Sequence, residues 1–128
     1  MQRAELPAAV QRAIDGQAQG ATIQGYSTER ENGKTYFEAA MMFNGHRKDV
    51  LFDTSGAVVE IEEQVAIGSL APLVIRGLQA QAGRGKIVQV ESISKHGQVV
   101  AYEAKVHTEG KRSEVQVGPD GKPLDHEE

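Results

Sequence analysis

The sequence repeats itself once, and this duplication constrains the fold more than any other feature. Six residues recur 64 positions later: Leu6, Val10, Gln17, Ala18, Ile23 and Gly33 match Leu70, Val74, Gln81, Ala82, Ile87 and Gly97. After one inserted residue the offset is 65, and Glu38, Ala39, Gly45, Arg47, Val50 and Gly56 match Glu103, Ala104, Gly110, Arg112, Val115 and Gly121. A period this long exceeds that of solenoid repeats, so it indicates one supersecondary unit used twice.

Each repeat is predicted to begin with an amphipathic helix. An apolar stripe at helical spacing marks both helices: Leu6, Val10, Ala13 and Ile14 in the first, and Leu70, Leu73, Val74 and Leu78 in the second. Pro7 suits the first turn of one helix, and Ser69 is expected to be the N-cap of the other. Glycines at 16, 20, 83 and 85 are expected to end the helices.

Antiparallel strands are predicted to follow each helix. Glycine-containing turns occupy matching places: "ENGK" (31–34) and "KHGQ" (95–98), "FNGH" (43–46) and "TEGK" (108–111), "DTSG" (53–56) and "GPDG" (118–121). Between the turns apolar residues alternate, which predicts one face against the helix: Phe37, Ala39, Met41, Val50 and Phe52, then Tyr102, Ala104, Val106, Val115 and Val117. A bulge is expected near Gly25, and a fourth strand (57–65) is reduced to "KPL" (122–124) in the second repeat.

These patterns predict an α+β fold of two tandem helix-plus-antiparallel-strands repeats. We expect the two sheets to join into one curved antiparallel sheet with both helices on one face. The whole chain, residues 1–128, is predicted to be a single domain, with repeats at about 5–66 and 68–124 and a short acidic tail at 125–128. A chain of this length can bury roughly two-thirds of its unfolded surface.

Composition excludes several classes of protein. The net charge is −4, but the tail supplies Asp125, Glu127 and Glu128, and the remainder is almost neutral, so we expect no nucleic-acid partner. There is no cysteine for disulfide or thiolate chemistry. No apolar run is long enough to span a bilayer, and residues 1–16 lack the features of a signal peptide. The protein is therefore either cytoplasmic or exported with a leader removed ahead of this sequence.

The candidates for catalysis are weak. Asp53 in "DTSG" resembles the Asp-Thr-Gly of aspartic peptidases, but Ser55 replaces the required glycine and the duplicate has Gly118 instead of a second aspartate. A turn role for Asp53 is favoured. "AGRGK" (82–86) follows a helix rather than a strand, so it is not a phosphate-binding loop.

The titratable side chains also lack a catalytic or metal-binding pattern. Glu38 and Glu103 are expected to form cross-strand ion pairs rather than an acid–base pair. His46, His96, His107 and His126 have no ligand spacing. We predict no catalytic residues, no metal and no cofactor.

The outward face of the strands is the remaining candidate site. It combines aromatic, apolar and charged residues: Tyr36, Glu38, Met42, Arg47 and Leu51 in the first repeat, and Glu103, His107 and Arg112 in the second. Two interpretations stay open, a solvated surface with ordinary ion pairs or a docking surface, since Tyr, Met and Arg are enriched at interfaces.

The motifs "NGKTYFEA" (32–39) and "VLFDTSG" (50–56), after a Leu-Pro helix, resemble PepSY-like domains, which are similar to the β-lactamase inhibitor protein. The resemblance covers most of residues 5–124 in two copies. It implies a protein- or peptide-binding module of the bacterial periplasm or cell surface, with an inhibitory or regulatory role as one form of that function, rather than an enzyme. An alternative is a small-ligand carrier that uses a cleft between sheet and helices; no nucleic acid or membrane span is implied.

Overall fold

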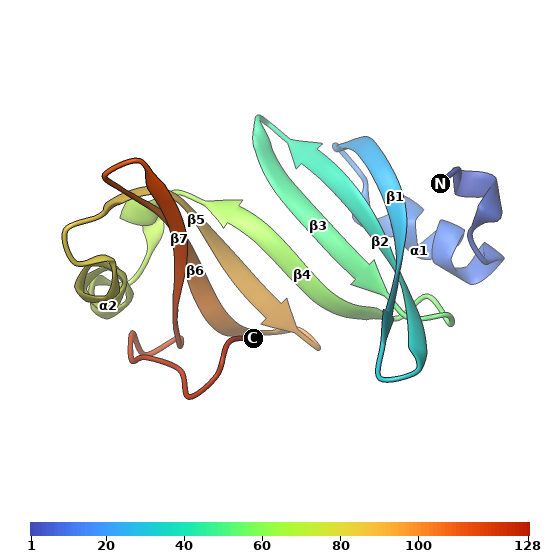
Figure 1. Cartoon of the computed structure of the whole chain (residues 1–128). Coiled ribbons are helices and arrows are strands. Elements are labelled where there is room, and N and C mark those ends of the chain that lie inside the picture. Colours follow the sequence, from blue (N-terminus) through green and yellow to red (C-terminus); the bar gives the residue numbers. More distant parts are fainter. The chain divides into compact units, whose positions relative to one another are not determined.

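The computed structural model describes all residues from 1 to 128, and its elements follow the predicted order (Figure 1). The first half contains η1 (Arg3–Glu5), α1 (Ala8–Gln17), β1 (Thr22–Glu31), β2 (Lys34–Phe43), β3 (His46–Phe52) and β4 (Val58–Val65). The second half contains η2 (Ile67–Ser69), α2 (Pro72–Ala82), β5 (Lys86–Lys95), β6 (Gln98–Thr108) and β7 (Lys111–Val117). The seven strands form one antiparallel sheet in the order β1 to β7, which confirms the predicted α+β class.

The element boundaries reproduce the duplication seen in the sequence. η1 and η2, like β1 and β5, begin and end 64 residues apart, whereas β3 and β7 are 65 residues apart. Strand β6 has 11 residues against 10 in β2, so the inserted residue lies within β6. The two halves therefore share one order of helix and strands.

The chain divides into two compact units. Unit 1 contains residues 1–63 and 95–97, and unit 2 contains residues 64–94 and 98–128. The predicted curvature of the sheet and the common face for both helices depend on how these units are placed, so they stay predictions, as does the assignment of a single domain.

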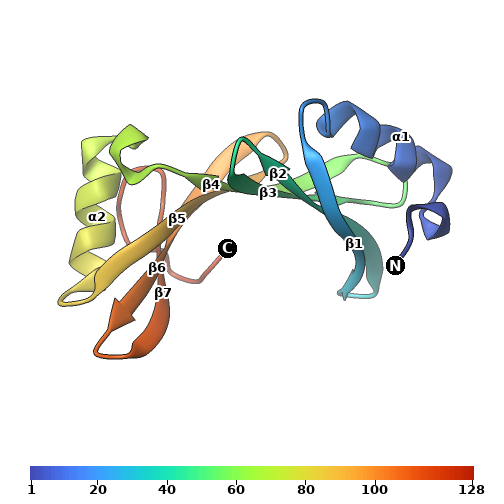
Figure 2. The same ribbon diagram turned by 90° about the horizontal axis from the view of Figure 1, so that it is seen from above.

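The core of unit 1 lies between α1 and strands β1 to β4, and Figure 2 shows α1 along one side of these strands. Helix residues Val10 and Ile14 are fully buried, and so are Met41 and Phe52 on the strands. Each such side chain contributes roughly 1.5–3 kcal/mol of burial free energy. The predicted inward positions of unit 1 are confirmed: Phe37, Ala39, Met41, Val50 and Phe52.

The core of unit 2 is built in the same way from α2 and its strands. Val74 and Leu78 of α2 pack with Val90, Val106 and Val117. Tyr102 packs against this cluster but is only half-buried. Leu73 was predicted in the helix stripe, and this was wrong: its exposed fraction is 59%, because α2 turns it away from the line of Val74 and Leu78.

Both helices begin later than predicted. Ser69 is not an N-cap, since it ends the 3-10 turn η2, where its hydroxyl donates to the carbonyl of Ala66 at 2.6 Å. Helix α2 begins at Pro72, whose missing N–H and fixed φ suit the first helical position. Pro7 is the N-cap residue of α1 rather than part of its first turn.

The predicted turns are confirmed by the backbone. In "ENGK", Asn32 and Gly33 both have positive φ, 52° and 78°, as a type I′ hairpin turn requires. The register between β1 and β2 shifts between Ile23 and Gly25, where the bulge was expected. A single bridge between Val117 and Pro123 is what remains of a fourth strand in unit 2.

A close backbone contact recurs in both units. Gly56 and Gly121 occupy equivalent turn positions with φ of 89° and 82°. A Cβ atom on Gly56 would lie 2.6 Å from the carbonyl oxygen of Ala9 in α1, and one on Gly121 would overlap the carbonyl of Leu73 in α2. The last turn of each repeat therefore packs directly on the first turn of its own helix.

Candidate binding face

The strands of unit 1 have an open face, opposite the face that packs on α1. We define it by Tyr36, Glu38, Ala40 and Met42 of β2 and Arg47, Asp49 and Leu51 of β3. Glu38 lies opposite Leu51, Ala40 opposite Asp49, and Met42 opposite Arg47. Directly opposed residues share a face, so these positions form one surface.

The apolar part of this open face is smaller than predicted. Tyr36 and Met42 are half-buried, but Leu51 is only 8% exposed. Leu51 lies between Glu38 and Glu60 on the neighbouring strands, and these longer side chains flank it. Leu51 is thus a buried member of the face, with little area for contact.

The charges of the unit 1 face are incompletely balanced. Arg47 contacts Asp49 of the same strand, with 3.1 Å between Nη2 and Oδ2, while the Oδ1 atom of Asp49 is buried without a hydrogen bond. Burial raises the pKa of the Glu38 carboxyl, and the charges of Asp49, Glu29 and Glu60 raise it further. The charge of Arg47 opposes this rise, but Leu51 rather than a cation stands directly opposite Glu38.

The open face of unit 2 is built from the equivalent positions of β6 and β7. Its opposed pairs are Glu103 with Gln116, Lys105 with Glu114, and His107 with Arg112. Gln116 is 8% exposed because it is held on both sides: its Nε2 donates to Glu103 at 2.8 Å, and its Oε1 accepts from the backbone N–H of Glu128 at 2.9 Å. The acidic tail therefore reaches this face.

Glu103 has a folded-state pKa above the ordinary carboxyl value. Burial is the main cause, and the neighbouring carboxylates Glu114 and Glu91 add to it, against the hydrogen bond from Gln116. The folded state thus binds the Glu103 proton more tightly than the unfolded state does. The resulting stabilisation is present below the unfolded pKa and is lost as the pH rises through the folded pKa.

We expect the substitution Glu103→Gln to gain stability relative to the original protein as the pH rises from about 4 to about 7, because glutamine cannot ionise and still accepts from Gln116. Asp53→Asn should show the opposite trend, since bonds from Ser55 and Ala57 lower the pKa of Asp53. Urea unfolding at several pH values measures both. The same pH trend in both variants would contradict these assignments.

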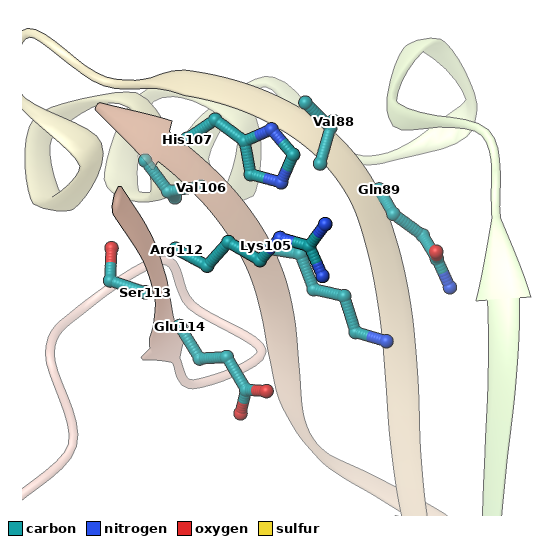
Figure 3. A pocket seen from close by; sticks show the side chains of 8 residues that line it. All are labelled: Val88, Gln89, Lys105, Val106, His107, Arg112, Ser113 and Glu114. Atoms are coloured by element: carbon teal, nitrogen blue, oxygen red, sulfur yellow. The ribbon is translucent and has the colours of Figure 1, made fainter. Parts of the chain in front are cut away.

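A shallow groove of about 490 Å³ lies on unit 2 (Figure 3). Strand β5 contributes Val88 and Gln89, and β6 and β7 contribute the charged side chains Lys105, His107, Arg112 and Glu114. Lys105 lies 3.6 Å from Glu91, measured between Nζ and Oε1.

The two open faces differ at equivalent positions. Ala40 and Met42 of unit 1 correspond to Lys105 and His107 of unit 2, so the second face is more basic and less apolar. Lys105, Glu114 and Gln116 also lie on this face, although they were not among the predicted binding residues. The signal was available: Lys105 and Gln116 alternate with inward residues and replace Ala40 and Leu51 of the first repeat.

The remaining chemical candidates behave as structural residues. Asp53 Oδ1 accepts bonds from the Ser55 N–H at 2.9 Å, the Ser55 hydroxyl at 2.6 Å and the Ala57 N–H at 3.0 Å, which confirms the turn role. No group of three or more His, Asp or Glu side chains is arranged to hold a metal ion. The helices of the structure are all too short or too polar to cross a membrane.

Comparison with known proteins identifies the fold. No protein family known from sequence matches, and no curated protein matches. Among solved structures, a BLIP-like protein of Bacteroides fragilis (BLIP, β-lactamase inhibitor protein) superposes with a TM-score of 0.67 at 20% identity, over 93% of this chain and 83% of that one. A DUF2874 family protein of Bacteroides ovatus gives 0.70 at 20% identity, over 94% and 85% of the two chains.

A third structure, a candidate periplasmic protein of Bacteroides eggerthii, superposes with a TM-score of 0.73 at 18% identity, over 93% of this chain and 86% of that one. None of these three descriptions names an enzyme. Identities this low establish the fold alone: the chain has a BLIP-like fold.

Proposed function

We propose that this protein is a non-enzymatic protein- or peptide-binding module of the bacterial cell envelope, and that its partner docks on the open faces of the strands. The main supporting observation is that folding partly buries acidic groups on these faces and compensates them only in part. Glu38 and Glu103 are partly buried carboxylates with raised pKa values, and the Oδ1 atom of Asp49 is buried without a hydrogen bond. Such groups reduce stability in the free protein, and they are typical of surfaces kept for interaction.

Side-chain types on the open faces support the same function. Tyr36, Arg47 and Arg112 are of the kinds that most often anchor interfaces. The carrier alternative receives no such support, because Val10, Ile14, Phe52 and Met41 fill the space between α1 and its strands. The envelope location rests on the PepSY-like motifs and on the Bacteroides eggerthii structure described as a candidate periplasmic protein.

Capture of partners from a bacterial envelope extract tests the proposal. We expect Tyr36→Ala and Arg47→Glu each to reduce capture at least about tenfold, as loss of an interface anchor does. Arg12→Glu is the matched control, since it makes the same charge reversal at an exposed position of α1. Asp53→Asn should also leave capture unchanged. Loss of capture in Arg12→Glu, with both face variants intact, would place the working surface on the helix and refute the proposal.

A further inference from the structure

The groove of unit 2 contains an arginine that the rest of the protein does not neutralise. Arg112 is exposed and forms no hydrogen bond or ion pair. Its equivalent in unit 1, Arg47, contacts Asp49 at 3.1 Å. The duplication thus supplies an internal comparison: the same position carries a paired arginine in one unit and an unpaired one in the other.

Two further donors accompany Arg112. His107 lies directly opposite it on β6, and Lys105 lies two residues away on the same strand and on the same face. In Figure 3 the side chains of all three extend from β6 and β7 over the sheet in the direction of β5. Lys105 is shared with Glu91, but their 3.6 Å separation is longer than a direct hydrogen bond. At the equivalent positions unit 1 has the neutral side chains of Ala40 and Met42 and the ion-paired Arg47.

The acidic residue in the groove does not cancel this excess. Glu114 stands opposite Lys105, two residues from Arg112 on β7, and its carboxyl interacts with Glu103. The guanidinium therefore keeps its planar set of donors available, and that geometry matches a carboxylate or a phosphate through two parallel hydrogen bonds.

We infer that this groove binds a carboxylate side chain of an extended acidic peptide, with Arg112 as the principal contact and Lys105 and His107 beside it. The inference rests on the proposed function and names its ligand chemistry. A peptide is favoured over a free anion for two reasons. Val88, 47% exposed, gives the groove an apolar wall. On the same face, the side chain of Gln116 already accepts a backbone N–H, that of Glu128.

A defined probe tests this directly: a capped five-residue peptide with two glutamates that flank a leucine, its glutamine analogue, and inorganic phosphate. Binding to the full chain is followed by two-dimensional NMR titration of backbone amides. We expect saturable shifts around the groove with the glutamate peptide, and little response to the glutamine analogue. Arg112→Gln should weaken binding at least about tenfold, as loss of a charge-assisted hydrogen bond does.

The control Arg76→Gln removes the same charge from the exposed surface of α2 and should leave binding unchanged. An unchanged NMR spectrum away from the groove verifies that Arg112→Gln is folded. Three outcomes overturn the inference: no shifts at the groove, equal binding of the glutamine analogue, or Arg112-dependent binding of phosphate alone. If any of these occurs while Tyr36→Ala still reduces partner capture, the binding-module function stands and only this ligand assignment fails.

Discussion

Replacing Phe37 by alanine should lower the free energy of unfolding by roughly 3–5 kcal/mol, the range for large-to-small changes in a core. Phe37 is 9% exposed, lies opposite Phe52 of β3 and belongs to the cluster under α1. The substitution removes most of a buried aromatic side chain, and the neighbouring core residues can fill the resulting cavity only in part. Urea titration measures the change.

Tyr36→Ala is the matched control, because it truncates an aromatic ring one position away on the opposite face of β2. Tyr36 is half-buried on the open face, so its loss should cost well under half as much. Equal costs would mean that the faces of the strand are exchanged, since a register slip of one residue turns every side chain over.

Gly121→Ala should also be strongly destabilising, by about 3 kcal/mol or more. Two effects add: alanine is strained at a φ of 82°, and its Cβ would overlap the backbone carbonyl of Leu73 in α2. A backbone group cannot rotate away as a flexible side chain can, so α2 or the turn must shift.

Gly33→Ala separates the two effects. Gly33 has nearly the same φ, 78°, but nothing lies within 4 Å of a Cβ placed there. This variant should therefore lose only the strain component, roughly 1–2 kcal/mol. Equal losses in thermal or urea unfolding would show that the contact between the last turn and α2 contributes nothing to stability.

The sequence predicted the fold where local chemistry determines the backbone. Asn32 and Gly33 adopt positive φ because few other residue pairs tolerate it, and the 64/65 offset carries the same turns into unit 2. The start of α2 was missed because Ser69 satisfies a competing 3-10 turn, and Pro72 then begins the helix. Gly77, in the middle of α2, could have indicated a close contact of this helix. A Cβ atom there would overlap the backbone of Gly121, so Gly77 lies where α2 packs on the last turn.

The candidate face was predicted only in outline. Alternation placed Tyr36, Arg47 and Arg112 on the outward side, and cross-strand register agrees. Burial on that side could not be predicted, because Leu51 is enclosed by side chains of two neighbouring strands. The surroundings of the two arginines also differ: Arg47 contacts Asp49, whereas Glu114, at the position equivalent to Asp49, stands opposite Lys105.

Site-specific photo-cross-linking tests the central claim, that partners dock on the open faces, most directly. A photoreactive phenylalanine derivative is placed in turn at Met42 and His107, one on each open face, and at Arg12 and Arg76, one on each helix. After illumination in an envelope extract, we predict discrete partner adducts from positions 42 and 107 and none from positions 12 and 76. Adducts from the helix positions alone would contradict the account.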